Sequence, residues 1–178
     1  MNSETVICLG DFAENYKYVI QDEIQSFHWS NDQYTLHPLI LYNKSNEELE
    51  QNAYCIVSND NEHDVNMVYE IQKRITNDIK KKLPNIKNIE YFTDGSASQY
   101  KNCKNFLNLA HHAEDFHLNA KWNFFATSHG KQPCDGIGGT VKRLAAKASL
   151  QRNLENQIVT PEAMFEFCVN NIKGIEFI

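Results

Sequence analysis

Apolar residues occur along this chain in short runs separated by polar stretches, and the lengths of the runs predict strands. The runs lie at 5–10, 36–42, 53–57, 89–93 and 118–126. Short apolar runs bounded by turn residues are typical of buried strands. Pro38 favours an edge strand, or an early position in its strand, because proline cannot donate to the hydrogen-bond ladder. The segment 12–34 mixes aromatic and polar residues and fits either an excursion from the sheet or part of a hairpin.

Longer segments with apolar residues on one stripe predict helices at 65–83, 101–116, 140–154 and 161–172. We expect Asp64 to cap the first helix, Pro84 to end it and Pro161 to begin the last. Three strands in an antiparallel meander thus precede strands that alternate with helices, an order that favours parallel pairing through right-handed crossovers. The pattern predicts one α/β domain over residues 1–178, with a mixed five-stranded sheet and helices on both faces.

The composition supports a globular fold and argues against several classes of protein. A chain of 178 residues with 42 % hydrophobic residues suits one domain with its own core. It contains no run of 18 apolar residues, so we expect no membrane span, and its start shows no secretory signal. The five cysteines lie at least 31 residues apart. This spacing argues against a zinc ribbon or a disulfide scaffold and favours a reducing, intracellular compartment.

Three acids stand at matching places in the predicted topology. Asp11 and Asp94 follow the runs at 5–10 and 89–93, and Asp135 follows the last strand and opens the next helix. A mixed α/β sheet gathers strand ends at one edge, where acids from separate strands can meet. Each Asp taken alone is more simply a cap or a turn residue, but three in this arrangement favour a functional site.

A cluster of carboxylates repels itself at neutral pH unless a cation lies within it. Carboxylate oxygens are hard ligands that suit Mg²⁺ or Mn²⁺. Two such ions about 3.5–4 Å apart can hold the attacking and leaving oxygens of an in-line phosphoryl displacement. We therefore predict a two-ion site at Asp11, Asp94 and Asp135.

The segment around Asp135 is rich in glycine and carries a histidine. Six of the seven glycines flank the three acids or lie in this segment, and glycine permits close approach of the backbone to a ligand. We expect Gly136, Gly138 and Gly139 to present backbone N–H groups to a phosphate at a helix start. His129 is either an ordinary core or surface histidine, or a residue that orients a water or contacts the scissile phosphate.

Basic residues are concentrated in the same part of the chain. The net charge is −6, which argues against binding nucleic acid over the whole surface. Residues 116–154 nevertheless hold six basic residues and one acid, so this segment carries +5 and the remainder −11. Lys131, Lys142 and Arg143, together with Lys101 after the second acid, are candidates to hold a nucleic-acid backbone. A solvated helix face is the alternative, and Lys142 and Arg143 are expected to be exposed.

The motifs that surround the three acids carry a resemblance to a known superfamily. They are GDFAENY (10–16), TDGSASQYKN (93–102) and SHGK (128–131) with DGIGG (135–139). In this order, and with the predicted topology, they resemble the RNase H-like catalytic core of DDE/DDD transposases and retroviral-type integrases, as found in transposon-derived proteins. The motif-bearing part spans about 5–154, and the helix at 161–172 follows it.

The resemblance implies that Asp11 and Asp94 are the first and second metal ligands and that Asp135 is the third. Because many relatives carry a glutamate within a helix as the third acid, Glu155 is the fallback. The implied activity is metal-dependent DNA strand cleavage and transfer, with DNA, transposon ends included, as the partner and the nucleus as the location. A homo-oligomer is compatible with it. Two alternatives stay open: a nuclease without transposition, and a catalytically dead module that binds nucleic acid or protein.

Overall fold

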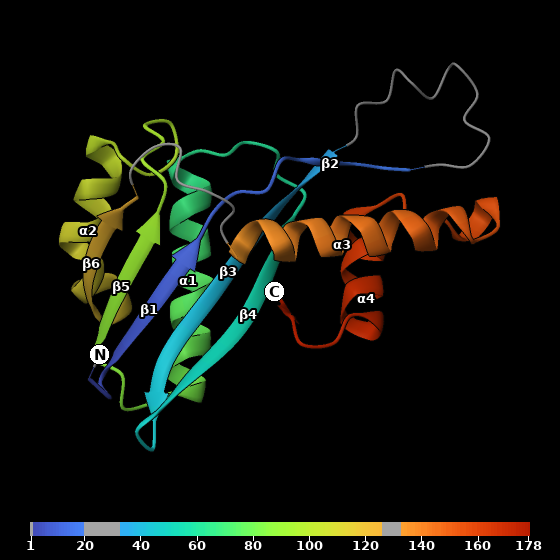
Figure 1. Cartoon of the computed structure of the whole chain (residues 1–178). Helices are drawn as coiled ribbons and strands as arrows, with labels where there is room; N and C mark the ends of the chain where they lie inside the picture. Colours follow the sequence, from blue (N-terminus) through green and yellow to red (C-terminus); the bar gives the residue numbers. More distant parts are fainter. Residues whose placement is uncertain (1, 20–32, 126–132) are drawn as a thin grey trace.

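The structure is a computed structural model that describes residues 2–19, 33–125 and 133–178. The strands are β1 (Thr5–Gly10), β2 (Tyr16–Lys17), β3 (Gln33–Ser45), β4 (Glu48–Ser58), β5 (Asn88–Thr93), β6 (Asn119–Phe124) and β7 (Glu176–Phe177). The helices are α1 (Val65–Lys82), α2 (Cys103–Phe116), α3 (Pro133–Leu150) and α4 (Pro161–Asn171), with a short 3₁₀ helix, η2 (Leu154–Asn156), between the last two. Figure 1 shows their arrangement.

The strands form one mixed sheet in the order β6-β5-β1-β3-β4-β7, and β2 pairs with β3 off this path. β1, β5 and β6 are parallel, whereas β3 runs antiparallel to both β1 and β4. The predicted meander and the predicted parallel pairing are therefore confirmed. The sheet has seven strands instead of five, because the two-residue strands β2 and β7 are too short to leave an apolar run in the sequence.

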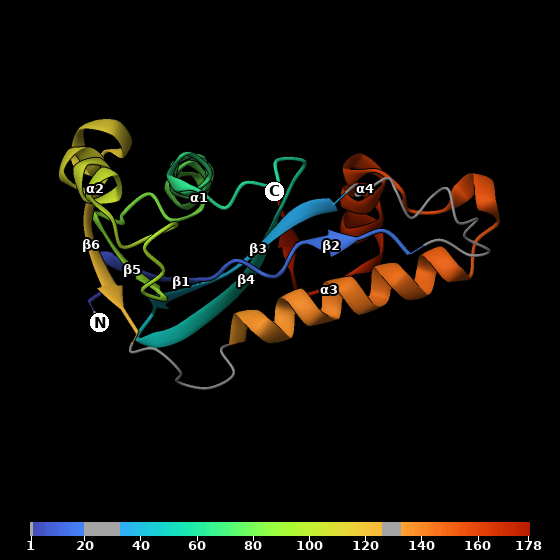
Figure 2. The ribbon, with the colours of Figure 1, turned by 90° about the horizontal axis from the view of Figure 1, so that it is seen from above.

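Helices cover both faces of the sheet, as expected (Figure 2). On one face, α1 packs Ile71, Ile75 and Ile79 into a core cluster with residues of β1, β3, β4 and β5, and α2 lies beside α1 and β6. On the other face, α3 contributes Val141 and Ala145 to a second cluster, and α4 packs against α3 and β4. The central strands are buried on both faces, which explains their nearly unbroken apolar runs.

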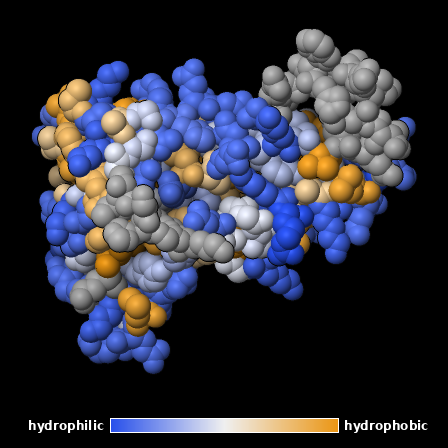
Figure 3. All heavy atoms as spheres, turned by 45° about the horizontal axis from the view of Figure 1, so that its top comes forward, coloured by the Kyte–Doolittle hydropathy of each residue, from blue (hydrophilic) through white to orange (hydrophobic). Residues whose placement is uncertain are grey.

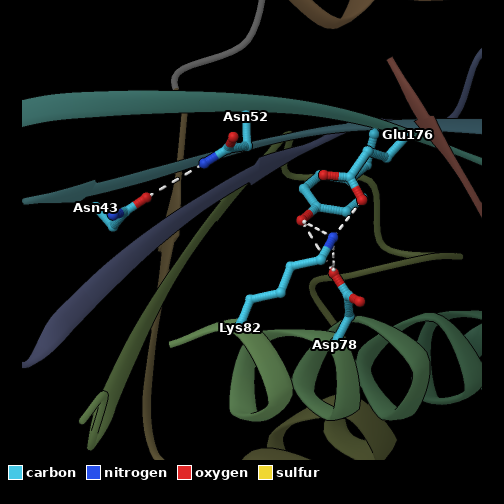
Figure 4. A network of polar contacts seen from close by, with 6 residues as sticks. Asn43, Asn52, Asp78, Lys82 and Glu176 are labelled. Atoms are coloured by element: carbon cyan, nitrogen blue, oxygen red, sulfur yellow. Dashed lines mark hydrogen bonds and ion pairs between the residues drawn. The ribbon is translucent and has the colours of Figure 1, made fainter. Parts of the chain in front are cut away.

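The ends of α1 follow the sequence signals. Asp64 caps the helix, and its side chain accepts a hydrogen bond from the backbone N–H of Met67 at 2.9 Å. The helix stops just before Pro84. Near this end, the Nζ atom of Lys82 lies 2.9 Å from Asp78 Oδ2 and 3.1 Å from the hydroxyl of Tyr54, and also contacts Glu176 (Figure 4). This network joins α1 to β4 and to β7.

All five cysteines lie in the described part of the chain and are free thiols, four of them buried. Within residues 2–19, 33–125 and 133–178, no helix combines the length and the hydrophobicity needed to cross a membrane.

Candidate functional site

The two acids that follow β1 and β5 lie at the same edge of the sheet. The two strands are parallel neighbours, and Leu9 pairs with Phe92 in their register. Asp11 and Asp94 each come two residues after this pair, so the chain brings them level with each other. The predicted adjacency of these strand ends is confirmed.

Asp135 reaches the same edge from α3. Its neighbour Cys134 is buried, and the Sγ atom of Cys134 lies 3.7 Å from the backbone oxygen of Leu9. One turn further along, a Cβ atom on Gly138 would lie only 3.1 Å from the Cβ of Ala13. The start of α3 therefore packs closely over the end of β1, and Asp135 is exposed in the first turn of this helix.

The three carboxylates interact electrostatically. The pKa of Asp11 is raised to about 6, first by burial and then by the negative charges of Asp94 and Asp135, although a hydrogen bond from the backbone N–H of Phe12 lowers it. Nearby like charges disfavour the ionised form of a carboxyl group. The charges of Asp94 and Asp135 thus both act on Asp11, and a cation beside it would relieve this repulsion.

The carboxylates do not form a finished metal cage. Across the described residues, no three His, Cys, Asp or Glu side chains come together in a geometry that could hold a metal ion. Asp94 is held by its own turn, since its Oδ1 accepts the N–H of Ser96 at 3.1 Å. The donors are nonetheless the hard oxygens that Mg²⁺ and Mn²⁺ prefer. The three carboxylates are therefore suitable ligands for such an ion, but their side chains would have to rotate to coordinate it together.

A layer of aromatic and histidine side chains beside the acids was not predicted. The hydroxyl of buried Tyr100 lies 2.9 Å from Nε2 of His37. Phe12 packs edge-on against His37 at 4.5 Å between ring centroids and stacks on His63 at 4.3 Å. Burial, and then the charges of the two strand-end acids, raise the pKa of Tyr100 well above its ordinary value. Tyr100 therefore stays neutral, and its ring stacks on that of Phe12, directly after the first acid.

The side chains of Leu39 and His37 lie so close to Gly10 that a side chain at this position would force them to move. A Cβ atom there would lie 2.6 Å from Cδ2 of Leu39 and 3.0 Å from Cε1 of His37. Burial lowers the pKa of His37 to about 3, so its ring is neutral at physiological pH. The contact between His37 and Tyr100 was not predicted from the sequence. The two residues are 63 positions apart, and no local pattern links them.

The candidate basic residues differ in their environments. Lys101 and Arg143 are exposed, and the Nζ atom of Lys101 lies 5.6 Å from the ring centroid of Phe124. Lys142 was expected to be exposed, and this expectation was wrong. It is half-buried, because its Nζ donates to the backbone oxygen of Glu14 and so joins α3 to the segment after β1. Lys131 and the predicted catalytic His129 lie outside the described residues.

The expected phosphate-binding loop of glycines is mostly helix. α3 begins at Pro133 and not at the predicted residue 140, because proline fits the first turn of a helix well. Only the first N–H groups of a helix lack an intrahelical acceptor. Gly136 lies in this first turn, whereas the N–H groups of Gly138 and Gly139 belong to the helix body. The prediction was therefore wrong for these last two residues.

The fallback acid does not belong to the site. Glu155 lies in η2, beyond the C-terminal end of α3. Because an α-helix rises about 1.5 Å per residue, the 18 residues of α3 separate it from the first turn by roughly 27 Å. A cavity of about 580 Å³ is likewise remote. It lies between α1 and α4 and is lined by Asp60, Arg74, Glu162 and Phe165, among others, but by none of the predicted site residues.

Comparison with known proteins assigns the chain to a family but does not indicate an activity. No curated protein and no solved structure matches the sequence. One family model, described as a domain of unknown function (DUF8701), matches residues 1–178 and so includes all three acid motifs. The chain therefore belongs to the DUF8701 family.

Proposed function

We propose that this protein cleaves and joins DNA strands in a reaction that depends on Mg²⁺ or Mn²⁺ and on Asp11, Asp94 and Asp135. One observation carries the proposal. Three acids from three separate motifs meet at one edge of the sheet, where burial first, and then the charges of Asp94 and Asp135, raise the pKa of Asp11 to about 6. Residues that only cap helices or form turns need not lie together, whereas the ligands of a divalent cation must.

The topology supports an RNase H-like catalytic core. The five central strands, in the order β6-β5-β1-β3-β4, form a mixed sheet with β3 antiparallel and with helices on both faces. This agrees with the five-stranded sheet that the resemblance implies. Asp11 and Asp94 follow two adjacent parallel strands, and Asp135 lies in the first turn of α3. This is the order of the three motifs that carry the resemblance.

Each acid has a role in the proposed reaction. Asp11 and Asp94 would hold the metal from the strand ends, and Asp135 would complete its ligands from α3. Bound Mg²⁺ or Mn²⁺ would act as a Lewis acid toward the phosphate and would activate the attacking water or the 3′-hydroxyl of the DNA. Lys101 and Arg143 are exposed on elements that flank the acids and would hold the DNA backbone. With DNA as the substrate, we expect the protein in the nucleus.

A second candidate is a module of the same fold that binds nucleic acid without cleaving it. The observation in its favour is that the described residues hold no ready-made group of three metal ligands. In this case the acids would retain their mutual repulsion, but divalent metal would have no effect on the protein.

Incubation of end-labelled duplex DNA with Mn²⁺ tests the proposal and separates the candidates. We expect nicked products from the wild type and joined products if strand transfer follows. Asp94→Asn should abolish both, because it removes the charge but keeps the oxygen that accepts the N–H of Ser96. Asp115→Asn is the matched control, since this exposed acid bonds Tyr69 near the opposite edge of the sheet. Nicks without joining indicate a nuclease. Equal cleavage by wild type and Asp94→Asn contradicts the proposal.

A further inference from the structure

A row of aromatic rings leads away from the acids toward the outside of α2. It begins at Phe12, directly after the first acid, and each ring lies within 6.3 Å of the next. In order, the rings belong to Phe12, Tyr100, Trp122, Phe124 and Phe106.

The inner part of this row is core and the outer part is surface. Tyr100 is buried, and Trp122 is held by a hydrogen bond of 2.9 Å from its indole nitrogen to Thr93. Phe106 is 47 % exposed, and its neighbour Leu107 is 60 % exposed. Figure 3 shows hydrophobic side chains gathered over α2 and β6. Core packing explains the inner rings but gives no reason for an exposed aromatic ring at the outer end.

The surface around the outer rings is basic. Lys101 lies over the ring of Phe124 at 5.6 Å, and Lys104 is exposed in the first turn of α2. The sequence contains no acid between Gly95 and Ala113. Phe106 is exposed and Phe124 half-buried. Accessible rings beside ammonium groups complement a chain of flat bases and phosphates better than they complement the apolar surface of another protein.

The position of these rings links them to the acids. Phe124 pairs with Thr93 in the register of β5 and β6, and Thr93 directly precedes Asp94. A strand whose phosphate lies at the acids therefore has its next nucleotides within reach of Phe124 and Phe106.

We infer that Phe106, Phe124, Lys101 and Lys104 form a platform for unpaired nucleotides next to the cleavage site. The bases stack on the two rings and the lysines hold the phosphates, a combination that binds single strands with little sequence preference. The choice of nucleic acid as the ligand rests on the proposed function. The platform adds that the strand next to the cleaved phosphate is bound unpaired.

Binding without metal tests the platform independently of cleavage. Fluorescence anisotropy in EDTA would compare a labelled 12-nucleotide oligo-dT with a duplex of equal length. We expect the wild type to prefer the single strand. Phe106→Ala should weaken single-strand binding by roughly 5- to 150-fold if one base stacks on this ring, and duplex binding much less. Phe106→Trp should restore the affinity, because it keeps a flat ring.

Leu107→Ala is the matched control, since it removes a more exposed apolar side chain without a ring. Equal losses in Phe106→Ala and Leu107→Ala, or unchanged single-strand binding in Phe106→Ala, would overturn the platform. A loss of self-association in both variants on sedimentation, with oligo-dT binding unchanged, would assign the patch to a contact between copies of the chain. Cleavage that depends on Asp94 with no effect of Phe106→Ala removes only the platform. Ring-dependent binding without cleavage removes only the catalytic proposal.

Discussion

The protonation of Asp11 links the candidate site to the stability of the folded protein. Its pKa of about 6 in the folded protein lies above the ordinary value of about 3.9. A raised carboxyl pKa means that the folded protein binds the proton more tightly than the unfolded chain does. The contribution of Asp11 to the free energy of unfolding therefore falls as pH rises from about 4 to about 6, and stays low above that.

Asp11→Asn should remove this unfavourable contribution in metal-free protein. We expect the free energy of unfolding of the variant to match that of the wild type near pH 4 and to exceed it by about 1–2 kcal/mol at pH 7. This is less than the full shift implies, because solvent screens a partly exposed carboxylate. Urea unfolding in EDTA across this pH range measures the difference. A difference that does not change with pH would show that the pKa of Asp11 is not raised in the folded protein.

Gly10 tests the packing beside the acids. Gly10→Ala should destabilise the protein by about 1–3 kcal/mol, because the new methyl group would press on Leu39 and on the His37 ring. Gly139→Ala is the control. A Cβ atom there meets nothing within 4 Å, and alanine favours a helix over glycine by about 0.5–1 kcal/mol. Thermal unfolding should thus show a lower melting temperature for the first variant and an equal or higher one for the second. The same sign in both would contradict the packing described for Gly10.

Among the elements, α3 carries both an acid and two of the basic residues expected to hold DNA, Lys142 and Arg143. Arg143→Ala should weaken duplex binding and reduce the slope of log K against log salt by about 0.9, the value for one lost phosphate contact. Its fold should be unaffected, because Arg143 is exposed. Titrations at several salt concentrations measure the slope, and an unchanged slope would indicate a solvated helix face. Lys142→Ala is expected to lower stability as well, since Lys142 also bonds the backbone oxygen of Glu14.

The sequence predicted those helices and strands whose pattern of apolar residues is set by burial in the core. The five longer strands and the four helices were all expected, because apolar runs and stripes report directly on which side chains face a core. Pro38 was misread. It lies inside β3, between β1 and β4, and not at an edge or an early position. The backbone oxygen of Pro38 accepts the N–H of Asp11, just after β1 ends, so the missing N–H of the proline falls where the ladder stops.

At the scale of the whole molecule, the sequence indicated which acids meet but not what supports them. Asp11 and Asp94 were predictable together, because parallel neighbouring strands end at one edge. The contact of Tyr100 with His37 and the ring row toward Phe106 were not predictable. They join segments that only the complete fold brings together, and the residues involved follow no local periodicity.

The central claim is that the three acids share a divalent cation, and thermal unfolding with and without Mn²⁺ tests it most directly. A metal that binds only the folded chain stabilises it by about 2.7 kcal/mol at 100 times its Kd, which raises the melting temperature of a chain of this size by roughly 5–10 °C. We expect this rise in the wild type and in Asp115→Asn. Asp94→Asn should show little or none, while its metal-free melting temperature is equal to or higher than that of the wild type. Equal Mn²⁺ shifts in wild type and Asp94→Asn, or no shift in either, would contradict the shared-cation site and the catalytic function built on it.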